Sequence, residues 1–446
     1  MGAALNGARC PAVLVTAAAS GQGKTTVTAA LARLHARQGR RVYVFKCGPD
    51  FLDPQWHQIA SGTPAHPLDL WMTGEQDTRA RLHAAALEAD LILVEGAMGL
   101  FDGTPSAADL AERLGLPVLA VVDASAMAAT FGALALGLQH YRPGLRWAGV
   151  LANRVASERH AQLLQGGLRT PEHWLGAIHR VSVRVGDQSL LPERHLGLVS
   201  APELADRMQR LDAAADALAA TPLGRMTLQD WQRWAVDFAP PDAEQETPPL
   251  LAGRTVAVAR DAAFCFIYQA NIDCLRRLGA QVVFFSPLQD AALPPCDALW
   301  LPGGYPELHA ERLAANQALR DSLAAHVAQG RPVWAECGGM MALCDAITLA
   351  DGTRHAAWGL LPGAVRMQRR LAALGPQQLD LDGDVLRGHT FHYSTLESSA
   401  PILTRTTRPA GVHGAGEAVY RHGSIHASYF HAWFPSSPAA IARLLT

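Results

Sequence analysis

A cysteine stands between a predicted strand and two glycines in residues 332–339, Pro-Val-Trp-Ala-Glu-Cys-Gly-Gly. The glycines permit the tight turn of a nucleophile elbow, which would present the Cys337 thiol at the end of the strand. The N–H of Gly338 could then stabilise an oxyanion. Residues 301–307, Leu-Pro-Gly-Gly-Tyr-Pro-Glu, end another predicted strand. Gly304 or its neighbour could supply a second oxyanion donor, and a plain turn is the alternative. We expect the other cysteines to be buried small hydrophobes.

A cysteine nucleophile needs a base, and the C-terminal region offers two histidines. Residues 426–431 read His-Ala-Ser-Tyr-Phe-His, at the end of a predicted strand. A single histidine in an aromatic run is more often a packed core residue than a catalytic group. The strand-end setting, and the need of Cys337 for a partner, lead us to predict His431 rather than His426 as the base.

A glycine-containing loop follows the predicted strand of residues 12–16. It reads Ala-Ala-Ala-Ser-Gly-Gln-Gly-Lys-Thr-Thr over residues 17–26 and leads into a helical pattern. Strand, loop and helix in this order are typical of a P-loop, whose backbone N–H groups hold phosphate oxygens. Lys24 would lie near the β- and γ-phosphates, and Thr25 could bind Mg²⁺. The predicted nucleotide-binding residues of the loop are Gly21, Gly23, Lys24, Thr25 and Thr26.

Carboxylates follow two further predicted strands. Asp50 and Asp53 come after the strand of residues 41–46, in Lys-Cys-Gly-Pro-Asp-Phe-Leu-Asp-Pro, where they could bind a ligand or stabilise a turn. Glu95 ends the next strand, at the place of the second Mg²⁺-organising carboxylate of P-loop enzymes. Asp102 lies in the glycine-rich loop that follows. A buried strand rarely ends in such residues for packing alone, so we expect function here.

Two shorter segments carry weaker signals. Asn153, in Ala-Asn-Arg-Val after a predicted strand, could read the edge of a nucleotide base or cap the strand end. Arg194 and His195, in Arg-His-Leu-Gly-Leu, could bind carboxylates. A surface loop with a snorkelling arginine is the alternative for this second pair.

The composition limits the class of protein. A length of 446 residues favours two or three domains. A net charge of −2 and 17% charged residues give no electrostatic reason to expect nucleic acid as a partner. Neither a membrane-spanning run nor a leader pattern stands out. Seven cysteines without CxxC pairs predict neither a disulfide framework nor a zinc site, and they favour a reducing, cytoplasmic location.

Short apolar strands alternate with helical stretches along the chain, which predicts α/β folds with mostly parallel sheets. A helical tail over residues 201–238 leads into a proline-rich, acidic segment, 239–249, which we interpret as a linker. We therefore predict an N-terminal domain over residues 1–238 and a C-terminal domain over residues 250–446. The predicted strands are residues 12–16, 41–46, 91–95, 118–122 and 148–151 in the first domain and 255–259, 281–285, 298–301 and 332–335 in the second.

Taken together, these motifs resemble those of the cobyrinic acid and hydrogenobyrinic acid a,c-diamide synthases. The resemblance covers nearly the whole chain, and the order of its motifs makes it specific although each motif alone is weak. It implies a P-loop NTPase-like domain related to dethiobiotin synthetase, joined to a flavodoxin-like class I glutamine amidotransferase domain. The segments that carry it are residues 20–26, 46–54, 68–72, 95–103, 152–155, 194–198, 302–307, 336–339, 388–394 and 427–431.

The resemblance implies a ligase of cobalamin biosynthesis that uses ATP, L-glutamine and Mg²⁺ to amidate the c and a carboxylates of a corrinoid through acyl phosphates. It implies neither a nucleic-acid nor a membrane partner, and it leaves a homodimer open. Trp433 stands where many class I amidotransferases have a carboxylate. The implied residues are Lys24, Thr25, Glu95 and Asp50 for nucleotide and metal, Asp50, Asp53, Asp102, Arg194 and His195 near the reacting carboxylate, and Cys337 and His431 for glutamine hydrolysis.

Two alternatives stay open. One is the same chemistry on other tetrapyrrole carboxylates, as in cobyric acid synthase or a nickel-sirohydrochlorin diamide synthase; residues 46–54 and 194–198 favour the a,c-diamide group. The other is a P-loop switch or scaffold protein with an inactive glutaminase domain. The presence of Cys337 and His431 argues against it, as does Ala19, where a partition-type ATPase would have a lysine.

Overall fold

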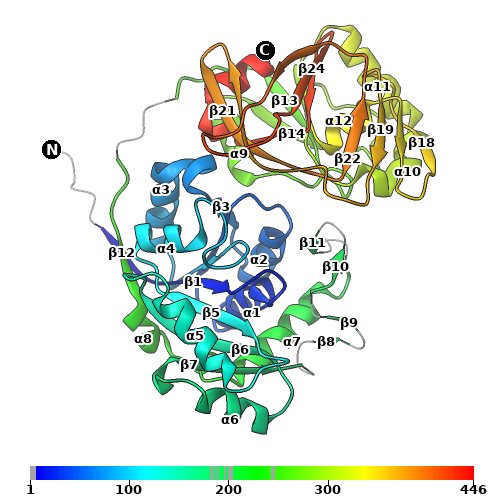
Figure 1. Ribbon diagram of the computed structural model, residues 1–446. Helices are drawn as coiled ribbons and strands as arrows, with labels where there is room; N and C mark the ends of the chain where they lie inside the picture. Colours follow the sequence, from blue (N-terminus) through cyan, green and yellow to red (C-terminus); the bar gives the residue numbers. More distant parts are fainter. Residues whose placement is uncertain are drawn as a thin grey trace, which may run out of the picture. The chain divides into compact units, whose positions relative to one another are not determined.

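The chain folds into two compact units, Met1–Glu244 and Gln245–Thr446, each with its own central sheet (Figure 1). The computed structural model describes residues 7–180, 184–185, 188–189, 191–194, 197–198, 204–242 and 247–446. Among these residues, no helix combines the length and the apolarity that crossing a membrane requires.

The N-terminal unit is built on a parallel sheet with strand order β3-β2-β4-β1-β5-β6-β7. Its central strand, β1, is buried along nearly its whole length, and the carboxyl ends of β1, β2 and β4 lead into the loops that carry the predicted phosphate and carboxylate motifs. The strands β1 to β7 are Ala8–Ala17, Val42–Cys47, His66–Leu68, Leu91–Glu95, Val118–Asp123, Trp147–Val155 and Trp174–His179.

Helices cover both faces of this sheet (Figure 1). Successive side chains of a strand point to opposite faces, so Val13 and Val15 of β1 pack in one core while Ala12 and Leu14 pack in the other. The first core is covered by α1 (Lys24–Arg37), α2 (Asp53–Ser61), α7 (Arg207–Ala219) and α8 (Leu228–Trp231), and the second by α3 (Glu75–Ala86), α4 (Ala107–Leu114), α5 (Thr130–His140) and α6 (Glu158–Gly166). Shorter elements are η1 (Leu70–Gly74), η2 (Pro171–His173), η5 (Gln232–Trp234), β8 (Arg184–Val185), β9 (Gln188–Ser189), β10 (Glu193–Arg194) and β11 (Gly197–Leu198).

The prediction of a helical tail over residues 201–238 is wrong at its C-terminal end. Residues Ala235–Phe238 form β12, which pairs antiparallel with the start of β1. Ala235, Val236 and Phe238 are buried and Asp237 is exposed, and β12 pairs with residues 8–11, the part of β1 that precedes its pairing with β4 and β5. Pairing with a distant strand overrides local helix propensity here.

The C-terminal unit has a second sheet with strand order β14-β13-β15-β16-β25-β24-β23, parallel from β14 to β25. One face is covered by α9 (Gln269–Arg277) and α13 (Pro438–Leu444), and the other by α10 (Ala310–Ala315), α11 (Gln317–Ala328) and α12 (Gly338–Leu343). The strands are β13 (Thr255–Ala259), β14 (Gln281–Phe285), β15 (Ala298–Leu301), β16 (Val333–Glu336), β23 (Ile402–Arg405), β24 (Ala418–His422) and β25 (Ile425–Ser428).

Two smaller sheets complete the C-terminal unit. One has the order β18-β17-β19-β22, and the other, β20-β21-β26, carries the predicted base His431 in its edge strand. Their strands are β17 (Ala346–Thr348), β18 (Arg354–Ala356), β19 (Ala364–Met367), β20 (Ala373–Leu381), β21 (Asp384–His392), β22 (Ser394–Glu397) and β26 (His431–Ala432), and the short helices are η6 (Pro306–His309) and η7 (Phe434–Ser436). Both units are therefore α/β, as the sequence predicts.

Candidate active site

The loop of residues 17–26 joins β1 to α1 at the carboxyl edge of the N-terminal sheet. Gly23 immediately precedes α1 with a φ of 97°, a left-handed conformation that favours glycine. A Cβ at Gly23 would also collide with the side-chain amide of Asn153. That amide donates a hydrogen bond to the carbonyl of Gln22 at 2.9 Å. Asn153, on β6, therefore braces the predicted phosphate loop through its backbone.

Lys24 is the first residue of α1, and its side chain folds back over the loop. It is 7% exposed, and Nζ donates to the carbonyls of Ala19 at 3.1 Å and Met98 at 2.6 Å. Burial lowers the pKa of Lys24, and the positive charge of Lys46 lowers it further. Lys24 thus connects the predicted P-loop to the loop after β4.

A buried ion cluster lies beside the start of α1. Lys46 Nζ lies 2.5 Å from Asp53 Oδ2 and 2.7 Å from Glu95 Oε1. The hydroxyl of Thr25 donates to Glu95 Oε1 at 2.7 Å and to Asp53 Oδ2 at 3.3 Å. Nε2 of His57 lies 2.5 Å from Glu95 Oε2. The structure therefore brings together Thr25, Asp53 and Glu95, which the sequence analysis assigned separately to metal and substrate.

The charges of this cluster stabilise one another. Burial alone would raise the pKa of Glu95, but the charge of Lys46 and the contact with His57 hold that pKa well below its usual value. Burial likewise disfavours a charged Lys46, yet Asp53 and Glu95 outweigh it and raise the pKa of Lys46 well above the ordinary lysine value. Both side chains are therefore charged at neutral pH, although Glu95 is fully buried.

Lys46 and His57 had no role in the sequence analysis. Lys46 could have been found, because a lysine at the end of the apolar strand Val-Tyr-Val-Phe-Lys needs a buried counter-charge. It pairs in register with Glu95 of the neighbouring strand β4. His57 gives no such signal, because a histidine in α2 is indistinguishable from a surface residue until the fold buries it.

Asp50 lies in the turn before α2. Its Oδ1 accepts hydrogen bonds from the backbone N–H of Leu52 at 2.8 Å and of Asp53 at 3.0 Å, so the turn that the sequence offered as an alternative is present. Burial raises the pKa of Asp50 to about 7, with a further increase from the charge of Asp53. The carboxylate beside Thr25 in this structure is Asp53.

Asp102 fixes the glycine-rich loop that follows β4. Its Oδ2 accepts a hydrogen bond from the N–H of Gly99 at 2.9 Å. A Cβ at Gly99 would lie 2.5 Å from both the carbonyl oxygen of Ala18 and Oδ2 of Asp102. Glycine therefore lets this loop pack directly against the predicted phosphate loop.

Two further predictions fall in a segment that is described only in part. Arg194 belongs to β10, which pairs antiparallel with β11, and only its backbone is described. His195 lies outside the described residues. The predicted carboxylate-binding roles of both stay predictions.

No group of three or more His, Cys, Asp or Glu side chains that could hold a metal ion occurs in the part of the chain that the structure describes. The oxygens of Thr25, Asp53 and Glu95 nevertheless converge beside the predicted phosphate loop. Mg²⁺ is commonly held by one or two carboxylates together with phosphate oxygens and water, and not by a cage of protein groups. By its chemistry this donor set fits a Mg²⁺ ion that arrives with a nucleotide, and Lys46 Nζ contacts the same two carboxylate oxygens in this structure.

In the C-terminal unit, Cys337 occupies the turn between β16 and α12 with φ 45° and ψ −106°. A residue other than glycine is strained at this positive φ, as expected of a nucleophile elbow. The backbone N–H of Cys337 donates to the carbonyl of Ser428 in β25 at 2.7 Å. Burial raises the pKa of the thiol, and nearby carboxyl groups, first among them that of Glu307, raise it further. The free thiol is therefore protonated at neutral pH.

The loop after β15 packs against both the elbow and His431. A Cβ added to Gly338 would lie 2.9 Å from the backbone nitrogen of Gly304, and a Cβ added to Gly303 would collide with the imidazole ring of His431. The two predicted oxyanion donors, Gly304 and Gly338, thus lie side by side, next to the predicted base. Only the absence of side chains permits these approaches.

His431 is 1% exposed and lies directly opposite His389 of β21. The two rings stack with centroids 5.0 Å apart and planes at 18°, and the hydroxyl of Tyr268 lies 3.0 Å from Nε2 of His389. Burial, with a smaller contribution from His389, lowers the pKa of His431 well below its ordinary value. His431 is therefore neutral and able to accept a proton. The alternative base, His426, pairs with Trp334 within the sheet.

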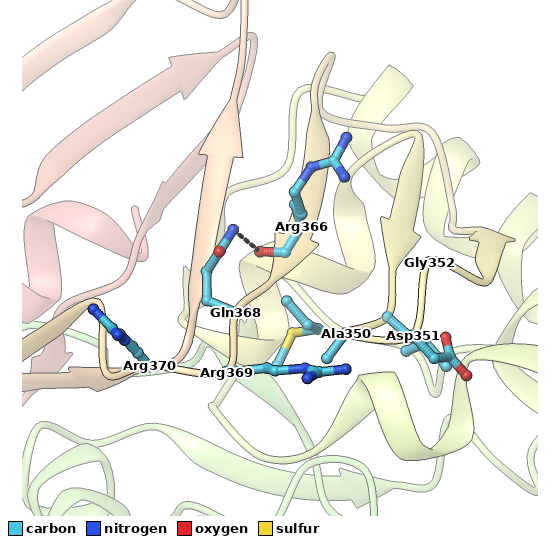
Figure 2. A pocket seen from close by; sticks show the side chains of 9 residues that line it. Ala350, Asp351, Gly352, Arg366, Gln368, Arg369 and Arg370 are labelled. Carbon is cyan, nitrogen blue, oxygen red and sulfur yellow. Dashed lines mark hydrogen bonds between the residues drawn. The ribbon is translucent and has the colours of Figure 1, made fainter.

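A surface hollow of about 590 Å³ opens elsewhere in the C-terminal unit, beside the β17–β18 turn and the residues after β19. Figure 2 shows the side chain of Gln368 turned to the carbonyl of Arg366, at 3.4 Å, with the side chains of Arg366 and Arg370 pointing in different directions. None of the residues predicted to do chemistry lines this hollow.

Comparison with known proteins identifies the family of each domain. Residues 13–188 match the CobQ/CobB/MinD/ParA nucleotide binding domain, and residues 255–439 match the CobB/CobQ-like glutamine amidotransferase domain. The chain is 56% identical to hydrogenobyrinate a,c-diamide synthase of Pseudomonas aeruginosa, over 98% of each chain. It is 48% identical to cobyrinate a,c-diamide synthase of Herminiimonas arsenicoxydans, over 97% of this chain and 96% of the relative. This chain belongs to the a,c-diamide synthase family.

Membership of the a,c-diamide synthase family confirms the predicted fold class, with an N-terminal nucleotide-binding domain and a C-terminal glutamine amidotransferase domain. It also confirms the predicted enzyme class, a glutamine-dependent ligase that binds ATP. The relationship extends to more distant members, such as cobyrinate a,c-diamide synthase of Salmonella typhimurium, which is 36% identical over 98% of each chain.

Proposed function

We propose that this protein amidates the a and c carboxylates of hydrogenobyrinic or cobyrinic acid in cobalamin biosynthesis, with ATP as the activating substrate and glutamine as the nitrogen donor. The observation that carries the proposal is the pairing, in one chain, of a phosphate loop beside buried carboxylates with a strained Cys337 in an elbow whose neighbouring loop, at Gly303 and Gly304, packs against His431. The full-length similarity to relatives named for these two substrates supports the same conclusion.

In the N-terminal domain, the backbone N–H groups of Gly21, Gly23 and Thr26 and the ammonium group of Lys24 bind the phosphates of ATP. Asn153, on β6, contributes to nucleotide binding, and its hydrogen bond to the carbonyl of Gln22 in the loop supports that role. Thr25 and Glu95 would hold Mg²⁺ together with Asp50, whose carboxylate accepts a hydrogen bond from the backbone N–H of Asp53, and the ion would neutralise phosphate charge. The contact between Thr25 and Glu95 supports this placement.

Activation of the corrinoid carboxylate is the step that needs ATP. A carboxylate oxygen attacks the γ-phosphorus and ADP leaves, which gives an acyl phosphate. Ammonia then attacks the carbonyl carbon, inorganic phosphate leaves and the nitrogen loses a proton, which gives the amide. We assign Asp50, Asp53 and Asp102 to the surroundings of the reacting carboxylate and its phosphate. Arg194 and His195 are assigned to binding corrinoid carboxylates.

In the C-terminal domain, the thiol of Cys337 gives its proton to neutral His431 as sulfur attacks the carboxamide carbon of glutamine. The N–H groups of Gly304 and Gly338 stabilise the oxyanion that forms. His431 returns the proton to the leaving nitrogen, so ammonia departs and a thioester stays on Cys337. Water, with His431 again as the base, hydrolyses the thioester to glutamate. The raised pKa of the Cys337 thiol and the lowered pKa of His431 support this neutral starting pair.

The two activities occupy separate domains in this proposal: residues 1–238 activate the carboxylate, residues 239–249 link, and residues 250–446 hydrolyse glutamine. The division of the chain into compact units between residues 244 and 245 supports it.

The test is mass spectrometry of products made by the purified protein with ATP, Mg²⁺ and glutamine labelled with heavy nitrogen in its amide. Hydrogenobyrinic acid and cobyrinic acid are supplied separately. We expect two labelled amides, and nuclear magnetic resonance places them at a and c. No labelled amide on either substrate would refute the proposal, and more than two would assign the protein to cobyric acid synthase chemistry.

Cys337→Ala tests the division of labour. We expect it to abolish transfer from glutamine while amidation with an ammonium salt continues, because the acyl phosphate forms in the other domain. The matched control is Cys344→Ala, which removes another buried cysteine of the same unit and should leave glutamine-dependent amidation intact. A folded Cys337→Ala protein that fails with ammonia as well contradicts the division.

A further inference from the structure

Glu336 is a buried carboxyl group with no part in the proposed chemistry. It is 1% exposed and immediately precedes Cys337 at the end of β16. A buried carboxyl group is costly unless its oxygens receive hydrogen bonds, so its partners indicate why the fold retains it.

One oxygen of Glu336 links β16, which leads into Cys337, to β26, which contains His431. Oε1 accepts a hydrogen bond from the indole N–H of Trp334 at 2.7 Å. The same oxygen accepts one from the backbone N–H of Ala432 at 3.3 Å. Ala432 immediately follows His431, as Glu336 immediately precedes Cys337. A single side chain therefore ties the strand that ends in the nucleophile to the short strand that carries the base.

The other backbone group of Ala432 is also held by a buried side chain. Nδ2 of Asn271 donates to the carbonyl of Ala432 at 2.8 Å, and Oδ1 of Asn271 accepts from the N–H of Phe434 at 2.9 Å. Asn271 is 1% exposed. Asn271 and Glu336 both hold the backbone of Ala432, but only Glu336 of these two is adjacent to Cys337 in the chain. Its hydrogen bond therefore links the backbone next to His431 to the backbone next to the thiol.

We propose that Glu336 is a positioning residue for glutamine hydrolysis, whose carboxyl oxygen sets the distance between Cys337 and His431 by holding the N–H of Ala432. The inference rests on the proposed roles of Cys337 and His431. Glu336 acts as a hydrogen-bond acceptor and not as a charge. Burial raises its pKa to about 8, which leaves it mostly neutral at pH 7 and agrees with that role.

The test compares two polar substitutions. Neither places an apolar group beside the N–H groups of Trp334 and Ala432, which would otherwise lose their acceptor. Glu336→Gln keeps a carbonyl oxygen at the same reach, whereas Glu336→Asp withdraws it by one methylene group. Proximity effects are steep, and a displacement of about 1 Å can cost about 100-fold in rate. We expect kcat for glutamine hydrolysis to fall about 10- to 100-fold in Glu336→Asp, with KM for glutamine little changed, and to stay close to wild type in Glu336→Gln.

Asn316→Ala is the control for simple loss of stability in the same unit. Asn316 caps α11, and its Nδ2 donates to the carbonyls of Pro287 at 3.0 Å and Asp290 at 2.9 Å. Its removal should lower the melting temperature without changing kcat. A second readout is the pH profile for alkylation of Cys337 by a glutamine-like chloroketone, which we expect to change in Glu336→Asp and not in Asn316→Ala.

The outcomes separate the inference from the proposed function. If wild type hydrolyses no glutamine, the proposed function fails. If wild type is active and folded Glu336→Asp keeps the wild-type kcat and alkylation profile, the positioning role is wrong. An equal fall in kcat for folded Glu336→Gln and Glu336→Asp also overturns it, because the carbonyl acceptor would then not be what matters.

Discussion

Replacement of Lys46 by methionine tests the buried ion cluster of the N-terminal unit. Lys46 lies 2.5 Å from Asp53 and 2.7 Å from Glu95, and the three side chains are 7%, 14% and 0% exposed, respectively. Methionine approximates the alkyl chain of lysine but carries no charge. Lys46→Met therefore leaves the Glu95 carboxylate buried without its principal cation.

The size of the effect follows from this burial. Removing one partner of a buried ion pair costs about 3–5 kcal/mol. Contacts of Glu95 with His57 and Thr25 survive the change, so we expect about 3 kcal/mol, at the lower end of that range. A unit of this size loses about 2–4 °C in Tm per kcal/mol, which gives a fall of about 6–12 °C.

The loss depends on pH in a defined direction. The folded-state pKa of Glu95 lies below its ordinary value of 4.5, so its contribution to stability is present at neutral pH and is lost as the pH falls through the folded pKa. In Lys46→Met the buried carboxyl group takes up a proton more easily. The difference in Tm between wild type and variant should therefore narrow as the pH falls from 7 towards 4.5.

Differential scanning calorimetry of the full chain measures both effects. The transition of the N-terminal unit is the one that ATP shifts to higher temperature, because a ligand stabilises the state that binds it. The matched control is Arg9→Met, which removes an ion pair with Asp237 whose side chains are 61% and 74% exposed and should change Tm little. If Lys46→Met lowers Tm no more than Arg9→Met does, the argument from the buried cluster is refuted.

Three further predictions concern glycines and a buried histidine. Gly23→Ala should weaken ATP binding in calorimetric titration, because alanine is strained at a φ of 97° and its Cβ would collide with Asn153; unchanged affinity would contradict this account of the loop. Gly338→Ala should slow glutamate release about 100-fold or more, because its Cβ would lie 2.9 Å from the nitrogen of Gly304 at the proposed oxyanion site, while ammonia-dependent amidation continues. Burial lowers the pKa of His35 from 6.5 to about 4. As the pH falls between these two values the unfolded chain binds a proton that the folded chain does not, so wild type loses stability over this range. His35→Leu should flatten this part of the plot of Tm against pH, and an unchanged slope would show that His35 does not cause it.

Features encoded within a few residues were predictable from the sequence. The strand, the glycines and the lysine of residues 12–24 predict a phosphate loop, because the required backbone angles and the period of a strand are local properties. The turn at Cys337 is predictable for the same reason, since glycines follow the cysteine directly. The two-domain α/β architecture also follows from the alternation of elements along the chain. The strand formed by residues 235–238 does not, because it depends on pairing with the distant start of β1.

Partners that are distant in the sequence were decided only by the tertiary structure. Lys46 contacts Glu95 because β2 and β4 are neighbours and these two residues pair in register. Neither the strand order nor the register can be predicted from either segment alone. Glu336 meets Ala432 across 96 residues of chain for a similar reason. The sequence by itself thus determined which residues are candidates for chemistry and where the glycine-containing turns that carry them lie. The fold decided which buried charges neutralise one another and that Glu336 binds the backbone next to His431, because those interactions depend on packing between elements and not on local backbone preference.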